Sequence, residues 1–233
     1  MNKKSIAAYT LFVFLATPSA RAGILVDHQP HPYGGLGSDT LWADAFGQPV
    51  WQRVADDFTL GSADQAVSLI FWGFYNADNP PATETMRIRV YAGRASDGLP
   101  DDIAILSETT VQNPSRVATG RRILTGIGPH EYRYQADLGS PLSLEARTRY
   151  WLEVAQMGDI TTNFRWEDSV NALDGVATVN SIHAEWRATF PGGPADAAFQ
   201  LISPEPASIA ILTFGSLFLA RRRRGRREAN EWK

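Results

Sequence analysis

The middle of the chain alternates apolar and polar side chains with a period of two residues, and this pattern limits the fold more than any other feature. Met86, Ile88 and Val90, for example, are separated by Arg87 and Arg89. A period of two places alternate side chains on opposite faces of a β-strand. Ten segments are predicted as short strands, from this alternation or from a run of apolar and β-branched residues: residues 54–60, 66–76, 85–91, 104–111, 116–124, 131–138, 150–157, 164–167, 182–190 and 197–202.

Turn-forming residues separate these segments, and no long stripe with the helical period of 3.6 residues interrupts them. About ten short strands at regular spacing are typical of an antiparallel β-sandwich or jelly-roll-like single domain. We assign this all-β domain to residues 53–203. Residues 23–52 are rich in Gly, Pro and His and are predicted to form an irregular N-terminal arm. The chain has no cysteine, so the domain depends on its core rather than on disulfide bonds for stability.

The first 22 residues have the three parts of a secretory signal peptide. Two lysines precede an apolar segment, residues 6–16, and Ala20 and Ala22 then form a small-residue cleavage motif. The apolar segment is shorter than the roughly 20 residues of a membrane-spanning helix. The pattern therefore predicts an N-terminal signal helix that is removed during export, so that the mature chain begins at Gly23.

A second short apolar segment lies near the C-terminus. It covers residues 207–220, contains no charged residue and follows Pro204, Glu205 and Pro206. As a helix, these residues would be about 21 Å long, against a hydrocarbon core of about 30 Å. The segment therefore predicts a C-terminal hydrophobic helix that anchors the chain transiently in the inner membrane.

Four consecutive arginines follow this apolar segment: Arg221, Arg222, Arg223 and Arg224. Basic clusters stay on the cytoplasmic side of a membrane. This orientation leaves the residues before Pro204 on the far side, where the signal peptide and the secretion translocon would deliver them. Both ends of the chain therefore predict export across the inner membrane.

The order of Pro204, Glu205 and Pro206, an apolar segment and an arginine cluster resembles the PEP-CTERM protein-sorting signal of Gram-negative bacteria. The resemblance covers residues 204–227 and leaves residues 228–233 as a short tail. It implies recognition by exosortase, an integral-membrane cysteine protease, with cleavage near the Pro-Glu-Pro motif. It also implies release to the cell surface or to the exopolysaccharide matrix of a biofilm. Five core segments, VADDFTL, FWGFY, RIRVYAG, RTRYWLEV and AFQLI, resemble a recurrent body of PEP-CTERM proteins that have no established activity.

The predicted domain is far more acidic than the whole chain. Residues 23–203 contain 22 acidic residues, 12 arginines and no lysine, a net charge of about −10, whereas the whole chain carries −3. Nucleic-acid binding depends on cationic side chains that neutralise phosphates, so this charge argues against a nucleic-acid partner and against anionic membrane surfaces. We predict no cofactor and no dedicated metal site. Structural Ca²⁺ at the loop acids Asp97, Asp101 and Asp102 is the alternative.

No hydrolase motif, metalloprotease motif or phosphate-binding loop is present in the sequence, so we predict no catalytic residues and no enzyme. Three tryptophans, Trp72, Trp151 and Trp166, are candidates for stacking against sugar rings. Burial within a strand that is covered on both faces is the alternative. The predicted function is that of an exported envelope or extracellular-matrix protein, sorted by exosortase, structural or adhesive, and associated with exopolysaccharide. A secreted carbohydrate-binding module or a glycan-active hydrolase or lyase is the alternative function.

Overall fold

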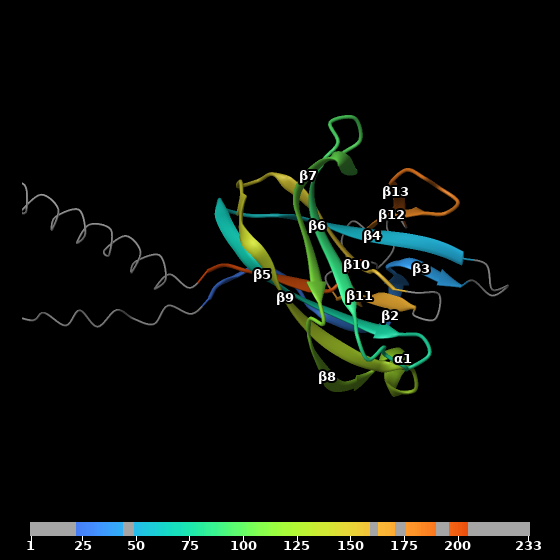
Figure 1. Ribbon diagram of the computed structural model, residues 1–233. Helices are drawn as coiled ribbons and strands as arrows, with labels where there is room; N and C mark the ends of the chain where they lie inside the picture. Colours follow the sequence, from blue (N-terminus) through green and yellow to red (C-terminus); the bar gives the residue numbers. More distant parts are fainter. Residues whose placement is uncertain (1–21, 44–48, 159–162, 171–175, 190–195, 205–233) are drawn as a thin grey trace, which may run out of the picture. The chain divides into compact units, whose positions relative to one another are not determined.

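The computed structural model describes residues 22–43, 49–158, 163–170, 176–189 and 196–204 (Figure 1). The residues from Gly23 to Pro204 belong to one compact unit. The described residues form fourteen strands and one helical turn, α1 (Ile123–Gly126). The prediction of an all-β domain is therefore confirmed.

The first sheet has seven strands: β1 (Ile24–His28), β2 (Pro30–Gly37), β5 (Asp64–Tyr75), β8 (Ser115–Arg122), β9 (His130–Leu144), β11 (Phe164–Ser169) and β14 (Phe199–Ile202). Strand β5 lies at its centre. One edge of β5 pairs with β9, which pairs with β8 on its far side. The other edge pairs with β14 and with β11, which continue to β1 and β2 respectively.

The second sheet also has seven strands: β3 (Asp39–Ala43), β4 (Pro49–Thr59), β6 (Thr85–Gly93), β7 (Pro100–Gln112), β10 (Arg149–Gln156), β12 (Val176–Asn180) and β13 (Arg187–Thr189). Strand β10 pairs with β6 on one edge and with β4 on the other. Strands β7 and β13 lie at the two ends of the strand order.

Apolar side chains from both sheets form one hydrophobic core. Leu69 and Phe71 of the first sheet and Leu152 of the second are fully buried in it. The ring of Phe71 stacks on Tyr134 with centroids 4.8 Å apart, and Phe164 meets both rings edge-on. Burial of these rings contributes more free energy than burial of aliphatic side chains of the same strands, because each ring removes a larger area from water.

The prediction of an irregular arm over residues 23–52 is wrong. The described residues of this segment form β1, β2, β3 and the beginning of β4. Its glycines permit close strand pairing instead of preventing it. A Cβ atom at Gly35 of β2 would collide with the backbone oxygen of Trp166 and would lie 2.8 Å from the ring of Phe74. The N-terminal residues therefore complete both sheets.

Most of the alternating segment at residues 182–190 is not a strand. In the described part of this segment, only β13 pairs with another strand, and Ile182 is 83% exposed. The side-chain oxygen of Asn180 accepts the backbone N–H groups of Ile182 and His183, each over 2.9 Å, and this bends the chain before the alternating residues. The preceding strand, β12, was not predicted from the sequence.

Gly73 of β5 lies where no side chain fits. An added Cβ atom would lie 2.5 Å from the Phe164 ring and 2.7 Å from the backbone oxygen of Arg165. We expect Gly73→Ala to lower the free energy of unfolding by about 1–3 kcal/mol, because the ring and β11 must shift to admit the methyl group. Gly61→Ala is the control, since nothing lies within 4 Å of its added carbon. Urea unfolding measures both variants, and equal losses would contradict the steric explanation.

Candidate functional site

The two ends of the described domain meet at one corner of the first sheet. The backbone N–H of Gly23 donates to Ser203 Oγ over 3.0 Å, and the backbone N–H of Ser203 donates to the carbonyl of Gly23 over 2.9 Å. Ile24 then pairs with Ile202. A Cβ atom at position 23 would lie 2.9 Å from Ser203 Oγ, so a glycine suits this contact. The first residue of the predicted mature chain is therefore bonded to the residue before Pro204.

Most of the predicted sorting residues lie outside the described residues. They are Ala20, Glu205, Pro206, Arg221, Arg222, Arg223, Arg224 and the whole of residues 207–233. Ala22, Gly23 and Pro204 are described. Within the described ranges, no helix is both long and apolar enough to cross a membrane.

The three tryptophans predicted as candidates for sugar stacking are buried. Trp72, Trp151 and Trp166 are 7%, 2% and 1% exposed. The indole N–H of Trp151 donates to the carbonyl of Gly98 over 2.8 Å, and that of Trp166 donates to the carbonyl of Ala198 over 3.0 Å. A stacking platform at these positions is therefore a wrong prediction, because no ring face is open to a sugar. Burial within covered strands, the alternative, describes them correctly.

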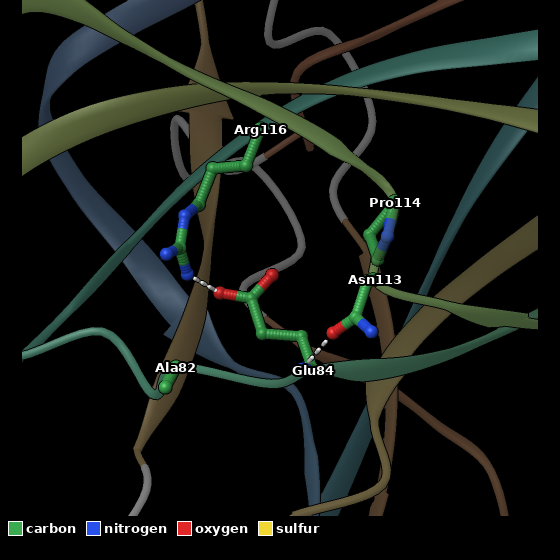
Figure 2. Close-up of a pocket in the computed structure, with 5 residues that line it drawn as sticks. All are labelled: Ala82, Glu84, Asn113, Pro114 and Arg116. Carbon is green, nitrogen blue, oxygen red and sulfur yellow. Dashed lines mark hydrogen bonds and ion pairs between the residues drawn. The ribbon is translucent and has the colours of Figure 1, made fainter.

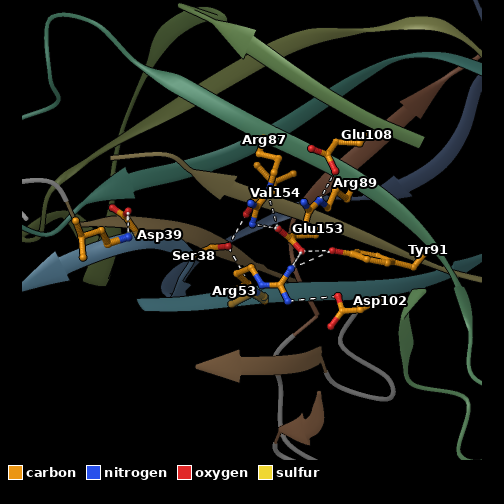
Figure 3. A network of polar contacts seen from close by, with 12 residues as sticks. Ser38, Asp39, Arg53, Arg87, Arg89, Tyr91, Asp102, Glu108, Glu153 and Val154 are labelled. Carbon is orange, nitrogen blue, oxygen red and sulfur yellow. Dashed lines mark hydrogen bonds and ion pairs between the residues drawn. The ribbon is translucent and has the colours of Figure 1, made fainter. Parts of the chain in front are cut away.

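Figure 3 shows a polar network around Glu153 of β10, on the side of the second sheet that faces away from the core. The carboxylate is fully buried. It accepts hydrogen bonds from Arg87 over 2.8 and 3.2 Å, from Arg53 over 3.2 Å and from the hydroxyl of Tyr91. The guanidinium of Arg53 also lies 4.9 Å above the ring of Trp186. This carboxylate is held by charged partners on both oxygens, and it ties β4, β6 and β10 together.

A pair of buried carboxyl groups, Glu131 of β9 and Glu167 of β11, lies in the first sheet. Burial raises the pKa of Glu167 to about 10, and the charge of Glu131 adds to this effect. Arg121 of β8 contacts Glu131, with Nη2 2.5 Å from Oε2 and Nε 3.0 Å from Oε1. At neutral pH Glu167 is therefore protonated, and Arg121 neutralises the charge of Glu131.

His28 of β1 and Asp56 of β4 join the two sheets. His28 Nδ1 lies 3.1 Å from Asp56 Oδ2, which also accepts the backbone N–H of Ala197 over 3.1 Å. Burial raises the pKa of Asp56 to about 7, against the opposing effect of the hydrogen bond to His28. Burial lowers the pKa of His28, but the hydrogen bond and the nearby negative charges outweigh it and the net shift is upward. Both groups hold a proton more tightly in the folded domain than in free solution.

The acids that are the alternative calcium ligands already have protein partners, and two of them, Asp101 and Asp102, lie in β7 and not in a loop. Asp97 pairs with Arg94 over 2.8 Å, Asp102 pairs with Arg53 over 3.3 Å, and Asp101 accepts the backbone N–H of Ile103. Among the described residues, no group of three or more His, Asp or Glu side chains is arranged to hold a metal ion. The structure adds no support for calcium at these positions.

A small polar cavity beside Glu84 was not predicted from the sequence. Its volume is about 210 Å³, and it is lined by Ala82, Glu84, Asn113, Pro114 and Arg116. Figure 2 shows Glu84 between the side chain of Arg116 and the Asn113–Pro114 turn. Glu84 is only 5% exposed, so its carboxylate forms a buried wall of the cavity.

Hydrogen bonds between distant segments hold the polar groups of this cavity. The backbone N–H of Glu84 donates to Asn113 Oδ1 over 2.9 Å, and the backbone N–H of Asn113 donates to the carbonyl of Glu84 over 2.7 Å. Glu84 Oε1 accepts the hydroxyl of Tyr75 over 3.0 Å and a guanidinium N–H of Arg116. Arg116 also lies 5.3 Å above the ring of Tyr132. Because Glu84 is 29 positions from Asn113 and 32 from Arg116, no local motif could have indicated the cavity.

Comparison with known proteins places the chain in a family. The family described as Domain of unknown function (DUF7901) matches residues 27–209, which include part of β1 and all of β2 to β14. No curated protein matches the chain. Because the match covers most of the sequence, the chain belongs to the family described as Domain of unknown function (DUF7901).

Proposed function

We propose that this protein is an exported component of the cell envelope or extracellular matrix, sorted by exosortase through residues 204–227. In this proposal the secretion translocon recognises the signal helix in residues 1–22, and the hydrophobic helix in residues 207–220 holds the chain transiently in the inner membrane. Cleavage near the Pro-Glu-Pro motif then releases the domain to the cell surface. There it has a structural or adhesive role in association with exopolysaccharide.

The pairing of Gly23 with Ser203 is the observation that supports this proposal best. A signal peptide removed before Gly23 and a tail cut after Ser203 would leave every described strand pair of the first sheet intact. The compact unit has nearly the same limits, Gly23 and Pro204. The domain can therefore lose both terminal segments without losing a described strand.

The buried carboxylates Glu153 and Glu131 pair with arginines of the same domain, which favours a non-enzymatic role. Glu153 is bound by two arginines and Glu131 by Arg121, so these charges serve contacts within the fold. Glycosidases hold two carboxyl groups about 5 Å or more apart, with the scissile bond between them. Glu131 and Glu167 are instead both fully buried, so a sugar chain has no access to either carboxyl group. The two facing sheets support a jelly-roll-like sandwich, a fold that by itself implies no activity.

Replacing Glu205 by alanine is expected to prevent release of the domain, because the substitution removes the charged centre of the sorting motif. The variant should accumulate in the membrane fraction, while the wild-type chain yields a shorter extracellular form that begins at Gly23. Mass spectrometry of both fractions, in a Gram-negative host that expresses an exosortase, measures this difference. Glu228→Ala, which changes a glutamate outside the motif, is the matched control and should be processed normally.

Deletion of residues 204–233 gives a second, independent test. Without the apolar segment, the domain should be secreted with no membrane-bound intermediate. Wild-type mature mass and wild-type location in both the Glu205→Ala variant and the deletion variant would contradict the proposed sorting.

A further inference from the structure

Several polar atoms of the residues that line the cavity beside Glu84 have no partner among the described residues. Glu84 Oε1 is bound by Tyr75 and Arg116, but Glu84 Oε2 accepts no hydrogen bond from a described residue. Asn113 Nδ2 and the Nε and Nη2 atoms of Arg116 likewise donate to none. In Figure 2 the second oxygen of Glu84 points into the space between Arg116 and Pro114. One strong acceptor and several donors therefore belong to residues that line the same small volume.

The charges at the cavity balance each other, and this balance selects the class of ligand. Glu84 forms an ion pair with Arg116. An anion would be repelled by the buried carboxylate, and a cation would be repelled by the guanidinium. A neutral molecule with hydroxyl groups avoids both costs, because one hydroxyl can donate to Glu84 Oε2 while a neighbouring hydroxyl accepts from Arg116 or Asn113. Adjacent hydroxyl groups on a sugar ring have this pattern of donors and acceptors.

The size of the cavity suits one sugar ring. Its volume of about 210 Å³ equals that of about seven water molecules in the liquid. It is smaller than the roughly 300–1,000 Å³ of pockets that hold drug-sized ligands. Ala82 and Pro114 supply apolar surface against which the C–H groups of a ring can pack.

The polar groups are also fixed before any ligand arrives. Two hydrogen bonds between Glu84 and Asn113 join the residue before β6 to the turn between β7 and β8. A third contact joins Thr85 to Gln112 through side-chain oxygens 2.7 Å apart. Groups held in this way lose little conformational freedom on binding, which favours recognition of a small ligand.

We propose that this cavity binds a single neutral sugar residue through Glu84, Asn113 and Arg116. The proposal deepens the proposed function and rests on it for the source of the sugar, an exopolysaccharide. One ring offers few contacts, so each site binds weakly. Many copies of the protein along one polymer supply the combined affinity.

Saturation-transfer NMR of the full chain, in a zwitterionic detergent that carries no sugar, tests this proposal. The probes are methyl α-glucoside, methyl α-mannoside and methyl β-galactoside at millimolar concentration. We expect saturation transfer to at least one probe. In Glu84→Gln the side-chain amide can present a donating nitrogen where the carboxylate presents an accepting oxygen. The Kd for the sugar probe should therefore rise by about tenfold or more.

A second variant tests the cavity without changing its ion pair. Ala82 is exposed at the rim, so Ala82→Phe should fold, fill the space and abolish saturation transfer. Ala95→Phe is the matched control, because Ala95 is an exposed alanine in the turn between β6 and β7 and should leave binding unchanged.

Three results would overturn the proposal: no transfer to any probe in the wild-type chain, wild-type transfer in Ala82→Phe, or loss of transfer in Ala95→Phe equal to that in Ala82→Phe. The Ala82→Phe result is decisive even if Glu84→Gln does not fold. The processing of Glu205→Ala is measured separately, so failure of sugar binding and failure of the proposed sorting are distinguishable.

Discussion

Replacing Glu153 by glutamine is expected to lower the free energy of unfolding by about 3–5 kcal/mol, as when one partner of a buried ion pair is removed. The change leaves Arg53 and Arg87, whose side chains are 14% and 13% exposed, without their shared negative charge. The hydroxyl of Tyr91 loses its charged acceptor as well. The melting temperature of a domain of this size falls by about 2–4 °C for each kcal/mol, so a decrease on the order of 10 °C is expected. Thermal and urea unfolding followed by circular dichroism measure the effect.

Glu108→Gln is the matched control for this substitution. Glu108 pairs with Arg89 over 2.7 Å on the same sheet, but its side chain is 43% exposed. Exposed ion pairs contribute about 0–1 kcal/mol because water screens the charges. If both glutamine variants lost the same stability, burial of Glu153 could not be the cause.

The domain is also expected to be more stable at pH 5 than at pH 9. Burial raises the pKa of Asp56 to about 7 and, together with the charge of Glu131, raises that of Glu167 to about 10. Above about pH 4.5 the unfolded chain releases these protons while the folded domain keeps them, so stability falls until the pH passes each folded-state pKa. The raised pKa of Asp56 lowers the stability as the pH rises from about 4 to 7, and that of Glu167 lowers it as the pH rises from about 4.5 to 10. Because one pKa unit corresponds to about 1.4 kcal/mol, the expected loss is several kcal/mol.

His28 changes the stability in the same direction. Its raised pKa means that the protonated ring stabilises the folded domain below about pH 6.5, and that this contribution disappears as the pH rises through the folded-state value. Urea unfolding at pH 5, 7 and 9 measures the combined effect of the three groups. Stability that increased from pH 5 to pH 9 would contradict the assignment of these protons.

Glu167→Gln separates the contribution of the buried carboxyl pair. Glutamine does not titrate, so this variant should be more stable than the wild-type domain at pH 9 and should show less loss of stability above pH 7. Glu145→Gln, an exposed position between β9 and β10, is the control and should keep the wild-type dependence on pH. A wild-type pH dependence in Glu167→Gln would show that another group is responsible.

The alternation of side chains predicted strands well where the two faces of a strand differ in polarity. The segment at residues 85–91 lies within β6, where Met86, Ile88 and Val90 enter the core and Arg87 and Arg89 face outward. Alternation shows which side chains share a face, but it does not show what covers that face. Trp72 is an example, because Ile70 and Ala198 pack beside it on the outer side of β5. The sugar-stacking prediction failed for this reason.

Other predictions failed where contacts between distant residues decide the local structure. The glycines of β2 indicated an irregular arm, but one of them, Gly35, is needed for the close approach of Trp166 and Phe74. The cavity beside Glu84 exists because the pairing of β6 with β7 brings the turn at Asn113 back to the start of β6. A contact over this sequence separation leaves no mark in a single sequence, so the site could be found only in the folded structure.

The pairing of β1 with β14 also determines how the domain responds to mechanical force. Gly23 and Ser203 face each other at the adjoining ends of two antiparallel strands, so a pull on both ends would break the hydrogen bonds between the strands one after another and not all at once. Strand β1 lies at the end of the strand order and would detach first, whereas β5 is bonded along both edges. A domain stretched between two attachments would therefore yield at this corner under a low force. A domain attached at one end only would carry no load across the corner, and its sheets would remain closed.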